Sequence, residues 1–177
     1  MTQPPHFDID GAIFFVTTRL SEGARKLSDR EAKIIQSTIV DMAVRKELKL
    51  FAYVIMPNHI HVLIQPTDAG ISKTMQLLKG RTSRKINIDK EAKAYPTQNN
   101  SSGMIAQGRG DFSRPIPINV WQKGFFDFTI LTEEKFRGKF NYIHYNPVKW
   151  GLVKKAEDYE YSSAKEYKVK YGEVFYE

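Results

Sequence analysis

The chain has 177 residues, of which 41% are hydrophobic and 12% aromatic, and its formal net charge is +7. This length suits one well-buried domain, and this composition excludes an intrinsically disordered chain. The sequence contains no cysteine, which excludes disulfides and thiolate metal sites and is typical of a cytoplasmic protein. We expect neither a signal peptide nor a membrane span. The excess of basic residues favours nucleic acid as a partner, although a basic surface that binds nothing explains the charge equally well.

The first predicted elements follow a lead-in over residues 1–10. Residues 11–20 (GAIFFVTTRL) are rich in β-branched and aromatic residues and predict a strand. Ser28 and Glu31 form a capping-box pattern that opens a helix. Apolar residues then recur at helical spacing, and we expect this helix to run to about Leu48.

Residues 53–65 (YVIMPNHIHVLIQ) carry the first candidate site. Two short β-prone runs flank a Pro-Asn turn signal, which predicts two neighbouring strands. Because side chains alternate along a strand, His59 and His61 project from the same face at the same end. Two imidazoles on a rigid support make half of a divalent metal site, and two exposed surface histidines are the alternative interpretation.

A second helix is predicted after a turn at residues 68–70, with apolar residues again at helical spacing. Several cations on one element neutralise adjacent phosphates, so its basic residues are the candidate contacts to a nucleic-acid backbone: Lys79, Arg81, Arg84 and Lys85. The order strand, helix, strand, strand, helix needs one more strand to give the ferredoxin-like arrangement.

Residues 89–119 interrupt this pattern with Asn, Ser, Gly and Pro, and predict a long flexible insertion that is partly disordered. Residues 120–130 (VWQKGFFDFTI) return to strand-like composition and should complete the sheet. Thr132 then caps a third helix, and we expect this helix to pack on the rest of the fold through its apolar stripe. Because a residue before proline is pushed away from helical dihedrals, Pro147 should end this helix at or near Asn146, with Gly151 as a stop.

The third helix carries the second candidate site. Tyr142 and Asn146 are four residues apart and share one helical face. A tyrosine can act as a covalent nucleophile, and an amide oxygen can complete a metal site begun by the two histidines. Such a metal would polarise a phosphodiester oxygen while the phenolate attacks phosphorus. The alternative is that both residues merely finish an amphipathic helix. His144 points elsewhere and is interpreted as structural or DNA-facing.

The tail, residues 154–177, is predicted to be an extension to a domain over residues 11–153. Its aromatic side chains either pack across the sheet or line a nucleic-acid groove, and packing is the favoured interpretation; they are Tyr159, Tyr161, Tyr167, Tyr171 and Phe175.

Two of these segments together resemble a known family. YVIMPNHIHVLI is similar to the HUH signature of single-tyrosine DNA transposases of bacterial insertion sequences. FNYIHYNPVKWGLV, with VWQKGFFDFTI before it, resembles the branch known as REP-associated tyrosine transposases. The resemblance extends from Gly11 to about Val153. The chain departs from the pattern at Phe126 and Phe128, where relatives often have tyrosine and histidine.

The resemblance implies a single-domain α+β fold, a ferredoxin-like sandwich with an antiparallel sheet and helices on one face. It implies that His59, His61 and Asn146 bind Mg²⁺ or Mn²⁺ and that Tyr142 is the nucleophile. Taken alone, two imidazoles favour manganese or zinc over magnesium. We add Lys149 to the candidate DNA contacts.

The implied substrate is single-stranded DNA next to a palindromic hairpin, cut to a 5′-phosphotyrosine and a free 3′-hydroxyl. The implied setting is the bacterial cytoplasm, at the nucleoid. A monomer and a helix-swapped homodimer both remain open. Two other functions compete: a DNA-hairpin binder without catalysis, and a metal-dependent phosphodiesterase that uses water.

Overall fold

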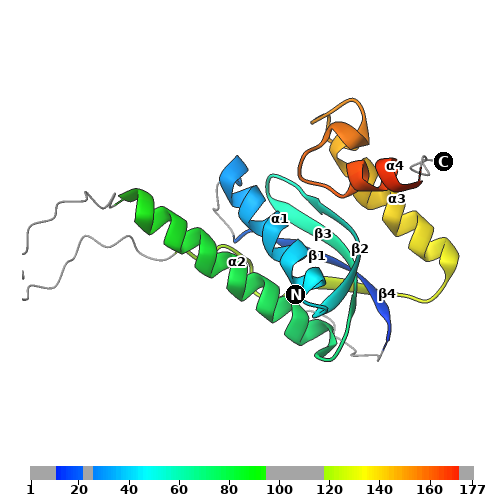
Figure 1. The fold of residues 1–177 in the computed structure, drawn as a ribbon, viewed down its shortest axis with the longest axis horizontal. Coiled ribbons are helices and arrows are strands. Elements are labelled where there is room, and N and C mark those ends of the chain that lie inside the picture. Colours follow the sequence, from blue (N-terminus) through cyan, green and yellow to red (C-terminus); the bar gives the residue numbers. More distant parts are fainter. Residues whose placement is uncertain (1–10, 22–25, 95–117, 172–177) are drawn as a thin grey trace, which may run out of the picture.

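Four strands form one antiparallel sheet in the computed structural model, which describes residues 11–21, 26–94 and 118–171 (Figure 1). The strand order is β2-β3-β1-β4, for β1 (Ile13–Arg19), β2 (Leu48–Ile55), β3 (His59–Pro66) and β4 (Phe126–Ile130). The helices are α1 (Asp29–Val44), α2 (Gly70–Ala94), α3 (Glu133–Lys149), the short 3-10 helix η1 (Ala156–Asp158) and α4 (Ala164–Tyr171). Strands β1 to β4 with α1 and α2 follow the predicted ferredoxin-like order, and the α+β fold is confirmed.

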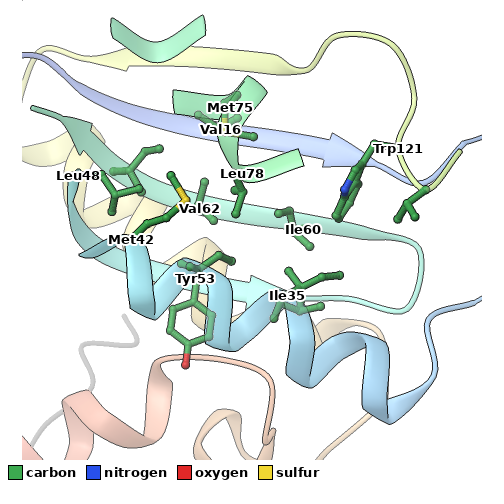
Figure 2. Close-up of a cluster of buried hydrophobic side chains, with 14 of the residues drawn as sticks. Val16, Ile35, Met42, Leu48, Tyr53, Ile60, Val62, Met75, Leu78 and Trp121 are labelled. Carbon is green, nitrogen blue, oxygen red and sulfur yellow. The ribbon is translucent and has the colours of Figure 1, made fainter. Parts of the chain in front are cut away.

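The two faces of the sheet are covered by different helices. Val16 and Val62 lie on the face that packs against α1 and α2, with Ile35, Met42 and Met75 in the same buried cluster (Figure 2). The neighbouring residues along β1 and β3 point the other way, because side chains alternate.

Helix α3 covers the second face. Phe15 and Leu63 pack there against Ile143, with Phe136 and Phe140 at the edge of the cluster. Helices α1 and α2 therefore share one face as predicted, whereas α3 lies on the opposite face, where its apolar residues pack against Phe15 and Leu63.

The predicted end of α1 and the predicted start of the insertion are wrong. Helix α1 ends at Val44 rather than near Leu48, because Lys46 takes a left-handed φ of 59° and Leu48 is buried as the first residue of β2. Helix α2 continues to Ala94, so residues 89–94 do not belong to the predicted insertion. Its end is tied to α1 by ion pairs of Asp89 with Arg30 and of Lys90 with Glu31. Residues 95–117, the rest of that insertion, lie outside the described residues.

Helix α3 also runs past its predicted end. It includes Pro147 and continues to Lys149. The last turn is closed by a Schellman-type cap, in which the Gly151 N–H donates to the Val148 carbonyl at 2.9 Å and the Leu152 N–H to the Pro147 carbonyl at 2.9 Å. Gly151 has a φ of 66°, which a residue with a Cβ atom adopts only with strain. The two hydrogen bonds of this cap compensate for the backbone hydrogen bond that Pro147 cannot donate.

The described part of the tail packs on the fold, as predicted. The Tyr159 hydroxyl donates to the Ile55 carbonyl at 2.8 Å, and the Tyr167 hydroxyl donates to the Phe51 carbonyl. Tyr161 packs against the core, whereas the Tyr171 side chain and Phe175 lie outside the described residues. No helix in the described ranges combines the length and apolar character needed to cross a bilayer.

His144 is a structural residue. It is fully buried, and its Nε2 lies 2.7 Å from the Ser163 hydroxyl. Burial lowers its pKa to about 4 from an ordinary 6.5.

This buried histidine predicts a loss of stability in acid. Between pH 6.5 and 4 the unfolded chain binds a proton at His144 that the folded chain does not, so the free energy of unfolding should fall as pH falls. We expect His144 to account for a loss of about 2 kcal/mol between pH 7 and pH 5. Urea denaturation of wild type and His144→Gln at both pH values measures it. The same pH dependence in both proteins would contradict the assignment.

Candidate active site

The histidine pair lies at one end of β3, on the face covered by α3. In the β1–β3 register His61 is opposite Thr17 and His59 is opposite Arg19. The His61 Nδ1 is 2.8 Å from the Thr17 hydroxyl, and the His59 Nδ1 is 2.6 Å from the Asn58 side-chain oxygen. With both Nδ1 atoms held, the two Nε2 atoms face each other at 3.1 Å. The predicted placement of both rings on one face is confirmed.

This arrangement aims the Nε2 atoms of both rings at one point. The Asn58 oxygen only accepts, so His59 carries its proton on Nδ1 and presents a lone pair at Nε2. A proton on the His61 Nε2 or a cation between the rings satisfies that lone pair. Burial, followed by the charge of Arg19, lowers the pKa of His59 to about 4. Burial, followed by the charges of His59, Arg19 and Lys139, lowers that of His61 to about 3. Both rings are neutral at pH 7, the form that binds metals.

Tyr142 lies beside the histidine pair in the same chain. Its ring centroid is 5.2 Å from that of His61 and 5.8 Å from that of Phe15. Phe15 in turn stacks on His61 at 5.3 Å, so one buried phenyl ring supports both side chains. Tyr142 remains 41% exposed, which leaves it open to a substrate. The phenol and the imidazole therefore meet within one chain, without exchange of helices between subunits.

Asn146 is buried on the same face of α3. It lies one turn after Tyr142 and one turn before Trp150, whose ring centroid is 6.3 Å from that of His59. Because its neighbours on either side contact the two histidines, Asn146 faces the pair. It is 2% exposed, and neither polar atom of its amide has a hydrogen-bond partner among the described residues. A buried amide without partners requires an explanation, and an oxygen ligand to a cation provides one.

These donors fit a divalent metal, with two imidazole nitrogens and one amide oxygen. The described ranges contain no group of three or more His, Cys, Asp or Glu side chains arranged to hold one. A metal here would therefore depend on Asn146 as its third protein ligand and would keep open positions for substrate.

An open cleft of about 650 Å³ adjoins these residues, between β1, the segment before β4, and α3. His61 and Tyr142 line it, together with the cations Arg19 and Lys139. The Lys139 Nζ lies 4.5 Å from the Phe15 ring centroid and 5.8 Å from that of Tyr142. An exposed phenol, two cations and a pair of imidazoles around one cleft suit a phosphodiester substrate.

Comparison with known proteins shows the family to which the chain belongs. A family model described as "Transposase IS200 like" matches residues 16–146, which include the second half of β1, all of β2 to β4, and the histidine, tyrosine and asparagine positions. The chain belongs to the IS200-like transposase family.

Relatives of this IS200-like transposase include proteins of the REP-associated branch. The chain is 20% identical over 165 residues to the REP-associated tyrosine transposase of Escherichia coli K12, covering 92% of this chain and 82% of that protein. It is 23% identical over 153 residues to a protein of Haemophilus influenzae described as a candidate member of that branch, covering 86% and 80%. A solved REP-associated tyrosine transposase bound to a REP hairpin has a TM-score of 0.72 at 20% identity, covering 99% of this chain and 89% of that one. That structure supports the fold.

The predicted DNA contacts on α2 belong to the helix that packs on the other face of the sheet from α3. The Lys79 Nζ donates to the carbonyls of Gln122 and Gly124 at 2.6 and 2.7 Å, which holds the segment that lines the cleft, and burial lowers its pKa. Arg81 pairs with Glu47 at 2.6 Å, and the Lys85 Nζ donates to the Thr38 hydroxyl at 3.1 Å. A role of these three cations in DNA binding would have to coexist with these contacts.

Arg84 and Lys149 are exposed, on α2 and in the last turn of α3. Their role as DNA contacts stays a prediction.

Sequence reasoning missed Thr17, Arg19 and Lys139. Thr17 and Arg19 alternate along β1 as the histidines do along β3, but only the strand register reveals that they lie opposite. Lys139 precedes Tyr142 by three residues, a helical spacing that places both on one side of α3.

Thr17 provides a test of the support given to His61. Thr17→Val keeps the β-branched shape but removes the hydroxyl that orients the imidazole, and we expect about 10–100-fold weaker Mn²⁺ binding. Calorimetric titration measures the affinity. Thr18→Val is the matched control, because the Thr18 hydroxyl is buried and has no hydrogen-bond partner in the described part of the chain. Equal losses in both variants would show that the Thr17 hydroxyl has no specific role.

Proposed function

We propose that this IS200-like transposase is a metal-dependent, single-tyrosine strand-transfer enzyme that cuts and rejoins single-stranded DNA next to palindromic hairpins. The observation that carries the proposal is the approach of Tyr142 to His61, 5.2 Å between ring centroids, at an open cleft. The related structure bound to a REP hairpin supports hairpin DNA as the partner class.

His59, His61 and Asn146 would hold the metal, Mg²⁺ or Mn²⁺, and its two nitrogen ligands favour Mn²⁺. When bound, the ion would supply Lewis acidity toward a non-bridging phosphate oxygen and toward the phenol.

The chain's own groups would act as follows. The Tyr142 hydroxyl would lose its proton to solvent water, and its oxygen would form a bond to phosphorus. The bond from phosphorus to the 3′ oxygen breaks, and that oxygen takes up a proton to become a free 3′-hydroxyl. Arg19 and Lys139, which line the cleft, offset the negative charge that develops on the phosphate.

The product is a 5′-phosphotyrosine on Tyr142. Because the link keeps a phosphoester bond, attack by another 3′-hydroxyl rejoins the strand and frees the tyrosine. No nucleotide cofactor is needed.

A denaturing gel tests the proposal. The protein is incubated with Mn²⁺ and a hairpin oligonucleotide that carries a labelled single-stranded flank, with an unstructured oligonucleotide of the same composition as control. The proposal predicts a covalent protein–DNA band that requires the hairpin and the metal. A native-gel shift without cleavage would instead indicate a hairpin binder, and cleavage without a covalent band would indicate hydrolysis by water.

A further inference from the structure

The edge strand β4 presents two exposed phenyl rings at the cleft. Phe126 and Phe128 are 53% and 37% exposed. In the β1–β4 register they lie opposite Thr17 and Phe15, so they occupy the sheet face that carries the histidine pair. Phe126 also lines the cleft beside Tyr142. Rings of this size left open to solvent next to a substrate site indicate a surface that binds something.

A cation is built into the same surface. The Lys139 Nζ lies 5.2 Å from the Phe128 ring centroid and 4.5 Å from that of Phe15. Its charge is therefore held over aromatic rings, three residues from the nucleophile on α3. We call Phe126, Phe128 and Lys139 the β4 platform.

Aromatic faces combined with a cation match the chemistry of a nucleotide whose base is unpaired. Bases stack on aromatic side chains only when they have left a duplex, and a lysine alongside pairs with the phosphate. The adjoining cleft of about 650 Å³ lies within the range of pockets that hold small ligands, about 300–1,000 Å³.

We propose that Phe126 and Phe128 stack on an unpaired base of the DNA single strand next to the phosphate attacked by Tyr142, while Lys139 pairs with a phosphate of that strand. The inference rests on the proposed function and adds to it a positioning device. The stack holds the strand so that the scissile phosphate meets the phenol, and it selects single-stranded DNA over duplex at this point.

A second copy of the chain is the competing occupant, because an open edge strand can pair with another. Strand β4 has only five residues, and Asp127 and Lys139 place charges at this edge. Short, charged edges disfavour strand pairing, so the observations favour DNA.

Abasic scanning tests the proposal. Fluorescence anisotropy measures the affinity of wild type for a hairpin oligonucleotide whose single-stranded flank carries one abasic site, moved position by position. One position near the cleavage point should weaken wild-type binding by about tenfold. The Phe126→Leu/Phe128→Leu variant should bind the intact oligonucleotide about tenfold more weakly and show no further loss with that abasic site. Leucine keeps apolar bulk, so the variant should fold, which circular dichroism checks.

Leu131→Ala is the matched control, because Leu131 follows the same strand, is 81% exposed and does not line the cleft. The inference would be overturned if the abasic site and the Phe126→Leu/Phe128→Leu double variant each weakened DNA binding independently of the other. Unchanged DNA affinity in the double variant would also overturn it. A change from dimer to monomer with unchanged DNA affinity would also overturn it and identify a self-association face. The covalent-band assay on the same oligonucleotide separates the two proposals. An adduct formed by wild type without the predicted abasic effect would overturn the stacking inference alone. The predicted abasic effect without an adduct would overturn the proposed reaction alone.

Discussion

Tyr142→Phe is expected to slow formation of the covalent protein–DNA adduct by at least about a thousandfold, while hairpin affinity stays within about twofold. The substitution removes only the attacking oxygen. The ring keeps its contacts with His61 and Phe15, so the cleft should keep its shape. Single-turnover rates on denaturing gels and equilibrium binding on the same oligonucleotide give the two numbers.

Tyr145→Phe serves as the matched control for this loss. Tyr145 lies on the same helix and is 49% exposed, but it does not line the cleft. We expect its variant to form the adduct at a rate close to that of wild type. Cleavage that persists in Tyr142→Phe would point to water as the nucleophile and would contradict the proposed role of the phenol.

His61→Phe is expected to weaken Mn²⁺ binding by at least about a hundredfold and to reduce adduct formation at least as strongly. Phenylalanine keeps a planar ring against Phe15 and Tyr142 but removes both nitrogens. Since the change removes a ligand and leaves the cations of the cleft in place, hairpin binding should change little. Calorimetric titration with Mn²⁺ and the adduct assay measure the two effects.

The control for His61 uses both the metal and a second histidine. Chelation of wild type should reproduce the loss, and added Mn²⁺ should restore wild type but not His61→Phe. His144→Gln removes a buried histidine that bonds Ser163 and should leave the adduct rate per folded molecule near that of wild type. Activity of wild type that withstands chelation would contradict a metal-dependent reaction.

The local periods of strand and helix account for what the sequence predicted at this site. A period of two places His59 and His61 on one face, and a spacing of four places Tyr142 and Asn146 together. The end of α3 escaped prediction because Pro147 normally breaks a helix, whereas here the cap at Gly151 closes one more turn.

The partners of the cations could not be read from local patterns. Lys79 and Arg81 form a basic cluster in sequence, yet they bond to Gln122, Gly124 and Glu47, which only the tertiary fold brings near. The position of α3 could not be read from the local pattern either. An apolar stripe shows that a helix packs on the sheet, but it does not show on which face.

The proposed reaction requires the phenol of α3 and the imidazole pair of β3 to act together within one chain. Mixing two inactive variants, Tyr142→Phe and His61→Phe, tests it most directly, with wild type diluted to the same concentration as control. A site complete in each chain predicts that the mixture stays at background, because neither chain holds both groups. Recovery of adduct on the His61→Phe chain, separated by a size tag, would show that Tyr142 serves a partner's histidines and would contradict the claim.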